Sequence, residues 1–123
     1  MVKKKKILIV DDEPEICEVL AQCLRRKGFA TEKAYNGLEA QEMIGKIKPD
    51  LIILDVLMPK MGGFEFLQYL KSHSSFCKIP VVMLTARAEP RNVDKGIFLG
   101  ADFYLPKPCT LQNLMQFIDV TIT

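Results

Sequence analysis

Residues 51–55 read LIILD, and this stretch decides the fold. Its four apolar residues do not alternate with polar ones, which is typical of a central strand covered on both faces of a parallel sheet. Asp55 ends the run. A carboxylate is therefore expected at the carboxyl end of a central strand, where open α/β sheets carry their binding sites.

Three more short apolar runs precede polar residues in the same way. They are residues 7–10 (ILIV), 81–84 (VVML) and 103–105 (FYL). Asp11 and Asp12 follow the first run, Thr85 the second and, two residues on, Lys107 the third. If all four runs are parallel strands, these side chains emerge at one edge of the sheet and converge with Asp55.

Amphipathic helices are predicted between the strands. Pro14 suits the first position of a helix, Asn36 with Glu39 forms an N-cap and its partner, and Thr110 can cap the last helix. A weak second strand is expected at about residues 29–34. From their spacing, the side chains expected to face the sheet are Ile16, Val19, Leu20, Cys23 and Leu24 in the first helix, and Val93 and Ile97 in the fourth.

Strands that alternate with helices imply parallel pairing through right-handed crossovers. The fold class predicted is α/β, a doubly wound five-stranded parallel sheet in the flavodoxin-like order 2-1-3-4-5 with five helices. In that order the first and third strands are neighbours, so Asp11 and Asp12 lie beside Asp55. Thr85 and Lys107 then flank Asp55 on its other side.

The length of 123 residues suits a single domain, with a core of about residues 5–119 and a basic tail at residues 1–4. Lysines occupy positions 3–6, and without them the net charge of +2 becomes −2 for the rest. A nucleic-acid-coating surface is therefore not expected. The first apolar run is too short for a secretory signal, no run is long enough to span a membrane, and the four cysteines show no C-x-x-C spacing. We expect a cytoplasmic location.

The converging side chains suit a divalent cation and a phosphoryl group. Asp12 and Asp55 supply the carboxylates that Mg²⁺ prefers, and Asp11 is expected to complete the metal site by orienting bound waters. Asp55 is the best candidate for a nucleophile that forms an acyl phosphate. The Lys107 ammonium and the Thr85 hydroxyl can stabilise charge on the phosphoryl oxygens.

Four segments resemble the receiver domain of two-component response regulators. They are ILIVDDEPEI, DLIILDVLMPKMGGFEFL, PVVMLTARAE and GADFYLPKP, and the resemblance extends over about residues 5–119. It implies that a histidine kinase or phosphotransfer protein donates a phosphoryl group to Asp55, with Mg²⁺ as cofactor. The chain would catalyse only its own phosphorylation and dephosphorylation, and so would not be an enzyme. It would act as a monomer or weak dimer, with an output that the sequence does not name.

The resemblance also implies a role for individual residues. Asp12 would bind Mg²⁺ directly, the Leu57 backbone carbonyl would be a further ligand, and the Lys107–Pro108 peptide bond would be cis. Phosphorylation would draw Thr85 towards the phosphoryl oxygens and let Tyr104 rotate inward, which changes the face built by the fourth helix, fifth strand and fifth helix. Two positions would tune the reaction: apolar Leu57, where many members carry a polar side chain, and Arg87.

Two other functions remain open at this point. A haloacid dehalogenase-type phosphohydrolase also uses an aspartate nucleophile, Mg²⁺, a threonine and a lysine, but it carries D-x-D after its first strand. Here Asp55 is followed by Val56 and Leu57, and no cap insertion is present. A receiver-like interaction module that works without phosphorylation is the second alternative, and the complete set of acidic residues argues against it.

Overall fold

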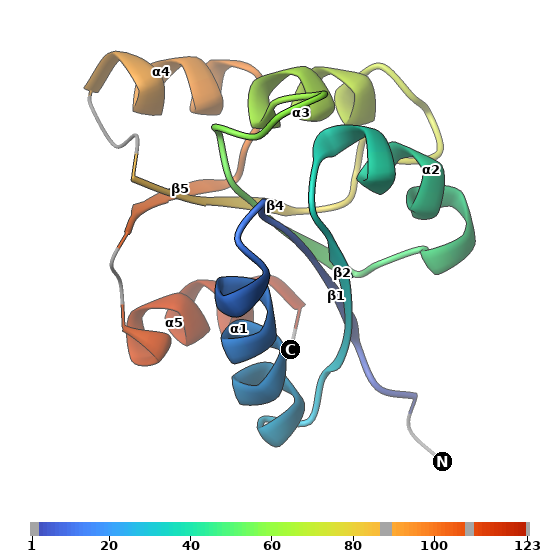
Figure 1. The fold of residues 1–123 in the computed structure, drawn as a ribbon, viewed down its shortest axis with the longest axis vertical. Coiled ribbons are helices and arrows are strands. Elements are labelled where there is room, and N and C mark those ends of the chain that lie inside the picture. The colour runs from blue at the N-terminus through green and yellow to red at the C-terminus, as the bar shows by residue number, and fades with distance from the viewer. Residues whose placement is uncertain (1–2, 87–89, 108–109, 123) are drawn as a thin grey trace.

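The structure is a computed structural model that describes residues 3–86, 90–107 and 110–122. Five parallel strands form one sheet in the order β2-β1-β3-β4-β5, which confirms the predicted fold class (Figure 1). The strands are β1 (Lys6–Val10), β2 (Ala30–Ala34), β3 (Leu51–Leu54), β4 (Val81–Thr85) and β5 (Phe103–Pro106). The helices are α1 (Pro14–Arg26), α2 (Gly37–Ile47), α3 (Gly63–Lys71), α4 (Pro90–Phe98) and α5 (Leu111–Ile122).

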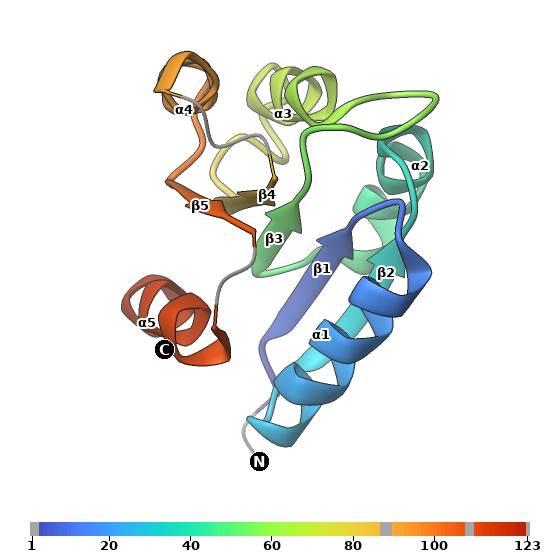
Figure 2. The same ribbon diagram turned by 60° about the vertical axis from the view of Figure 1, so that its left-hand side comes forward.

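Helices cover both faces of the sheet. Helices α1 and α5 lie on one face, and α2, α3 and α4 lie on the other (Figures 1 and 2). Each described helix is too short or too polar to cross a membrane.

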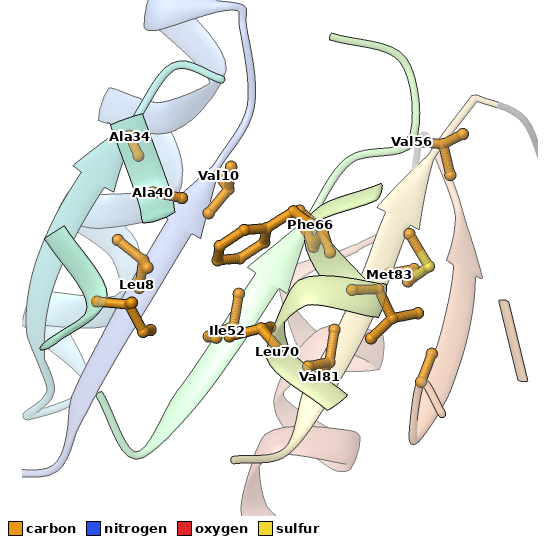
Figure 3. Close-up of a cluster of buried hydrophobic side chains, with 14 residues drawn as sticks. Leu8, Val10, Ala34, Ala40, Ile52, Val56, Phe66, Leu70, Val81 and Met83 are labelled. Atoms are coloured by element: carbon orange, nitrogen blue, oxygen red, sulfur yellow. The ribbon is translucent and has the colours of Figure 1, made fainter. Parts of the chain in front are cut away.

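Alternate residues along the strands divide the core into two clusters. Leu8, Ile52 and Met83 pack with Phe66 of α3 on the face covered by α2, α3 and α4 (Figure 3). Ile7, Ile9, Leu51, Ile53 and Val82 pack against α1 and α5 on the other face. All four residues of β3 are buried, as the unbroken apolar run predicted. Each fully buried Leu or Ile contributes about 1.5–3 kcal/mol, so β3 anchors both clusters.

The predicted helix starts are confirmed where the structure describes them. Pro14 is the first residue of α1. The Asn36 side chain accepts a hydrogen bond from the Glu39 backbone N–H at 2.8 Å, and Glu39 accepts one from the Tyr35 N–H at 2.9 Å. At α5, the Thr110 hydroxyl accepts from the Asn113 N–H at 3.0 Å. Local side chains therefore set where these three helices begin.

The predicted inner faces of two helices were partly wrong. In α1 the buried residues are Cys17, Ala21 and Leu24, whereas Val19 is 61% exposed. These three residues also follow helical spacing, and the small side chain of Ala21 lets the helix lie close to the sheet. Among residues 92–98 of α4, where burial is described, Gly96 is buried and Ile97 is 47% exposed. Apolar spacing marked the correct side of each helix only to within about one residue.

Candidate functional site

The site lies at the carboxyl ends of β1, β3, β4 and β5. Val10 of β1 pairs with Leu54 of β3, so the residues that follow them are neighbours, and the Asp55 N–H donates to the Val10 carbonyl at 2.9 Å. On the far side, the Lys107 N–H donates to the Thr85 carbonyl at 2.9 Å. The strand register therefore brings together residues from four separate parts of the chain.

Asp55 is held by the turn that follows β3. Its side chain is 8% exposed, and one carboxylate oxygen accepts from the Val56 N–H at 2.8 Å. Gly63, the first residue of α3, approaches so closely that a Cβ atom there would lie 2.0 Å from the Asp55 carbonyl oxygen. Its N–H donates to the Val56 carbonyl at 2.8 Å. Only a residue without a side chain allows α3 to begin against the backbone of Asp55.

Three carboxylates form a compact cluster at this edge. Asp11, Asp12 and Asp55 each offer an oxygen, and these oxygens lie within 4.8 Å of one another. Asp11 and Asp55 are buried, whereas Asp12 is exposed. One Asp11 oxygen accepts from the Glu13 N–H at 3.0 Å, which fixes the orientation of that carboxylate. The predicted convergence of the three acids is present in the structure.

Lys107 is the cation within this cluster. Its Nζ lies 2.5 Å from Asp11 Oδ2, 3.7 Å from Asp55 Oδ2 and 3.7 Å from Glu13 Oε1. Burial by itself would lower the pKa of Lys107. The hydrogen bond to Asp11 and the charges of Asp55, Asp11 and Glu13 outweigh burial, so the pKa is raised. The ammonium therefore stays protonated and acts as an internal counter-ion.

Thr85 completes the contacts of Asp55. Its side chain is buried and hydrogen-bonds the Asp55 carboxylate. Burial raises the pKa of Asp55, and the nearby charge of Asp11 raises it further. The Thr85 hydroxyl, Lys107 and the Val56 N–H act in the opposite direction without cancelling the effect. Asp55 is thus a buried carboxylate whose negative charge its neighbours do not fully stabilise. Groups with shifted pKa values of this kind often occur at functional sites.

The donor set fits a hard divalent cation. Three carboxylates carry more negative charge than Lys107 neutralises, and one of them, Asp12, faces solvent. Oxygen ligands with room for bound water are the arrangement that Mg²⁺ prefers.

The remaining predicted site residues lie around the edge or outside the described chain. The Leu57 side chain is 55% exposed. Tyr104 lies on β5 opposite Met83 and packs against the cluster of buried residues beneath α3 and α4. Arg87 and Pro108 lie outside the described residues. The predicted cis peptide bond between Lys107 and Pro108 therefore lies outside them too. Sequence analysis missed Glu13, whose contact with Lys107 had no signal beyond its place two residues after Asp11.

Comparison with protein families identifies the family to which the chain belongs. A family model described as the response regulator receiver domain matches residues 7–119. The chain belongs to this family. Membership makes it a receiver domain of two-component signalling, which is a signalling module and generally not a catalytic enzyme. The family is also one that binds Mg²⁺ at an acidic pocket, in keeping with the cluster of three aspartates.

Individual relatives agree with this assignment. Response regulator MprA of Mycobacterium ulcerans (strain Agy99) is 40% identical over 110 residues, which are 89% of this receiver domain and 47% of that protein. The chain therefore spans about half the length of the response regulators that it matches.

Solved receiver structures are similar over nearly the whole chain. The signal receiver domain of a histidine kinase from Syntrophus aciditrophicus has a TM-score of 0.89 and 38% identity, and the match covers 96% of this chain and 89% of that one. Vibrio cholerae chemotaxis protein CheY4 has a TM-score of 0.91 and 32% identity, with 98% and 100% covered. The fold is therefore shared with both a kinase-attached receiver and a chemotaxis receiver.

Proposed function

We propose that this receiver domain is a phosphorylation-activated switch that accepts a phosphoryl group on Asp55 from a histidine kinase or phosphotransfer protein. One observation carries the proposal. Asp55 follows the central strand, and its carboxylate is buried. The carboxylate is hydrogen-bonded to Thr85 and lies 3.7 Å from the Lys107 ammonium. Burial favours its reaction as a nucleophile, because the charged form is poorly stabilised by its surroundings.

The transfer is a displacement at phosphorus. A carboxylate oxygen of Asp55 forms a bond to phosphorus as the bond from phosphorus to the donor's histidine nitrogen breaks, and the leaving imidazole takes up a proton. The product is an acyl phosphate on Asp55. Lys107 Nζ and the Thr85 hydroxyl are the donors that contact the phosphoryl oxygens, where negative charge is concentrated.

Asp12, Asp55 and the backbone carbonyl of Leu57 would hold Mg²⁺, and Asp11 would orient the waters that complete its coordination. When bound, the ion neutralises charge on the transferred group. The exposure of Asp12 supports this assignment, because a ligand that faces solvent can reach an ion arriving from water.

Thr85 and Tyr104 would convert the phosphoryl group into a change of shape. Contact with the phosphoryl oxygens draws the Thr85 hydroxyl away from its present hydrogen bond with Asp55. Pro106 of β5 pairs with Thr85, and Tyr104 lies two residues before Pro106 on the same strand. Tyr104 then rotates inward. The face formed by α4, β5 and α5 changes in response. Such a switch acts by shifting an existing equilibrium between two conformations.

The donor protein would dock in a groove beside the site. An apolar groove is lined by Ile16, Val19 and Leu20 of α1, Leu84 of β4, Ala86 just after β4, and Lys107. Val19 is 61% exposed on it. Lys107 both lines this groove and lies 3.7 Å from Asp55, so a donor helix in the groove would place its phosphohistidine near Asp55. We also propose that the domain is cytoplasmic, that it is a monomer or weak dimer, and that it makes no contact with nucleic acid.

The test is incubation with acetyl phosphate and Mg²⁺, followed by intact-mass measurement. The expected product carries one phosphoryl group, and Asp55→Asn abolishes it. Asp94→Asn, which changes an exposed carboxylate on α4, is the matched control and should be phosphorylated like the wild type. Continuous release of phosphate over many turnovers would indicate a phosphohydrolase instead. No adduct on the wild type would indicate an interaction module that does not use phosphorylation.

A further inference from the structure

Helix α4 carries a glycine where it packs on β5. Gly96 is buried, and a Cβ atom built on it would lie 2.7 Å from Cδ2 and 2.9 Å from Cε2 of Tyr104, and 3.2 Å from Sδ of Met83. Contacts below 3.0 Å are essentially absent from real Cβ atoms. The ring of Tyr104 therefore fills the space that any side chain at position 96 would need.

A second glycine in the interior of a helix has a different environment. Gly45 of α2 is exposed, and its nearest neighbour for a Cβ atom is Phe76 Cζ at 4.0 Å, an ordinary contact. Glycine weakens a helix interior relative to alanine at either position. At Gly45 nothing nearby requires that cost, whereas at Gly96 the aromatic ring does.

Helix α4 also makes a contact with α3. Lys95, next to Gly96, places its Nζ 4.8 Å from the centre of the Phe64 ring on α3. Moving α4 outward to make room at position 96 would break this cation–π contact. The ring of Tyr104 gives way more easily, because a change of one side-chain rotamer disturbs fewer contacts than a shift of the whole helix.

We propose that Gly96 is the positioning residue of Tyr104: by carrying no side chain it keeps open the space in which the ring lies, and a methyl group there drives the ring out of this orientation. Gly96 thereby sets how readily Tyr104 moves between its positions. The importance of this for signalling rests on the proposed switch role of Tyr104, whereas the packing relation itself does not.

A double-mutant cycle in urea tests the packing. Gly45→Ala should raise the folded-to-unfolded ratio about fivefold, the gain expected for alanine over glycine in a helix. Gly96→Ala should fail to raise it, because the methyl group meets the ring. In a Tyr104→Ala background the ring is absent, and Gly96→Ala should then give the same roughly fivefold gain. Equal gains for Gly45→Ala and Gly96→Ala in the wild-type background would overturn the proposal.

Fluorine NMR of protein labelled with 3-fluorotyrosine follows the ring itself. The chain has three tyrosines, and Tyr104→Phe identifies the resonance of Tyr104. Gly96→Ala should displace that resonance, and Gly45→Ala should leave it in place; an undisplaced resonance in Gly96→Ala contradicts the proposal. Beryllium fluoride with Mg²⁺, a phosphoryl mimic, separates the two claims. If beryllium fluoride does not move the wild-type Tyr104 resonance, the proposed switch role of Tyr104 is wrong. The packing role of Gly96 is tested separately, by the shift of that resonance in Gly96→Ala.

Discussion

Replacing Lys107 by methionine removes the internal counter-ion of the aspartate cluster and keeps a side chain of similar length. Two carboxylates whose oxygens lie within 4.8 Å of each other repel by at least about 3.5 kcal/mol at an effective dielectric constant of about 20. Lys107, 3.7 Å from Asp55 and closer to Asp11, offsets a repulsion of this size. We expect Lys107→Met to lower the free energy of unfolding by about 3 kcal/mol at pH 7 with EDTA present, as for other broken buried ion pairs.

Magnesium should restore most of this loss. A divalent cation supplies the positive charge that the variant lacks, and binding at a hundredfold excess over Kd stabilises a fold by about 2.7 kcal/mol. Because the variant cluster is more negative than the wild type, Mg²⁺ should stabilise the variant more. Because the pKa of Lys107 is raised on folding, its contribution is present at neutral pH and disappears as pH rises through that raised pKa. The variant should therefore lose less stability at alkaline pH than the wild type.

Urea titrations with EDTA or with Mg²⁺ measure both effects. Lys33→Met is the matched control, because Lys33 pairs with Glu18 at 2.6 Å but both side chains are substantially exposed. Water screens such a pair, so the control should lose far less stability and should show no additional response to Mg²⁺. If the two variants lose equal stability, or if Mg²⁺ stabilises Lys107→Met no more than the wild type, the counter-ion argument is wrong.

Four further substitutions test other parts of the site. Asp12→Ala should weaken Mg²⁺ binding at least tenfold, about 1.4 kcal/mol, in a calorimetric titration, and an unchanged affinity would remove Asp12 from the metal site. Leu57→Asn should speed loss of the phosphoryl group roughly tenfold after the donor is removed, because a polar side chain can orient the attacking water. Arg87→Ala should change that rate less. If phosphorylated Leu57→Asn decays at the wild-type rate, the argument from water access is wrong. Gly63→Ala should destabilise the fold by about 3 kcal/mol or more in urea, because its Cβ would lie 2.0 Å from the Asp55 carbonyl oxygen, and a loss below about 1 kcal/mol would show that α3 can shift.

The parallel sheet and the edge that carries the site could be predicted from short apolar runs, and the strand order from the usual order of a flavodoxin-like sheet. Apolar runs identify buried parallel strands, and parallel strands place their carboxyl ends at one edge. The same reasoning predicts that Asp11, Asp55, Thr85 and Lys107 lie at this edge. The ion pair between Lys107 and Asp11 follows from the same alignment, once β1 and β5 flank the central strands.

The features that sequence analysis missed depend on distances between backbones. Nothing in the sequence around Gly63 or Gly96 states how closely another segment approaches, so their need for a missing side chain appears only in three dimensions. Val19 was assigned to the inner face of α1 because it is apolar, but apolar side chains at the edge of a helix face also line grooves. Glu13 was missed because ion pairs across a site depend on side-chain reach.

The contact between Lys107 and Asp11 joins residues 96 positions apart in the chain. Contacts of such long range form late, since the intervening chain must be ordered before they can hold, and a high contact order slows folding. During synthesis, β1 and β3 emerge from the ribosome well before β5. A nascent chain that ends before Lys107 would have its acidic residues without their cation. We therefore expect competence to accept a phosphoryl group to be acquired in a single late step, so that incompletely folded molecules do not signal.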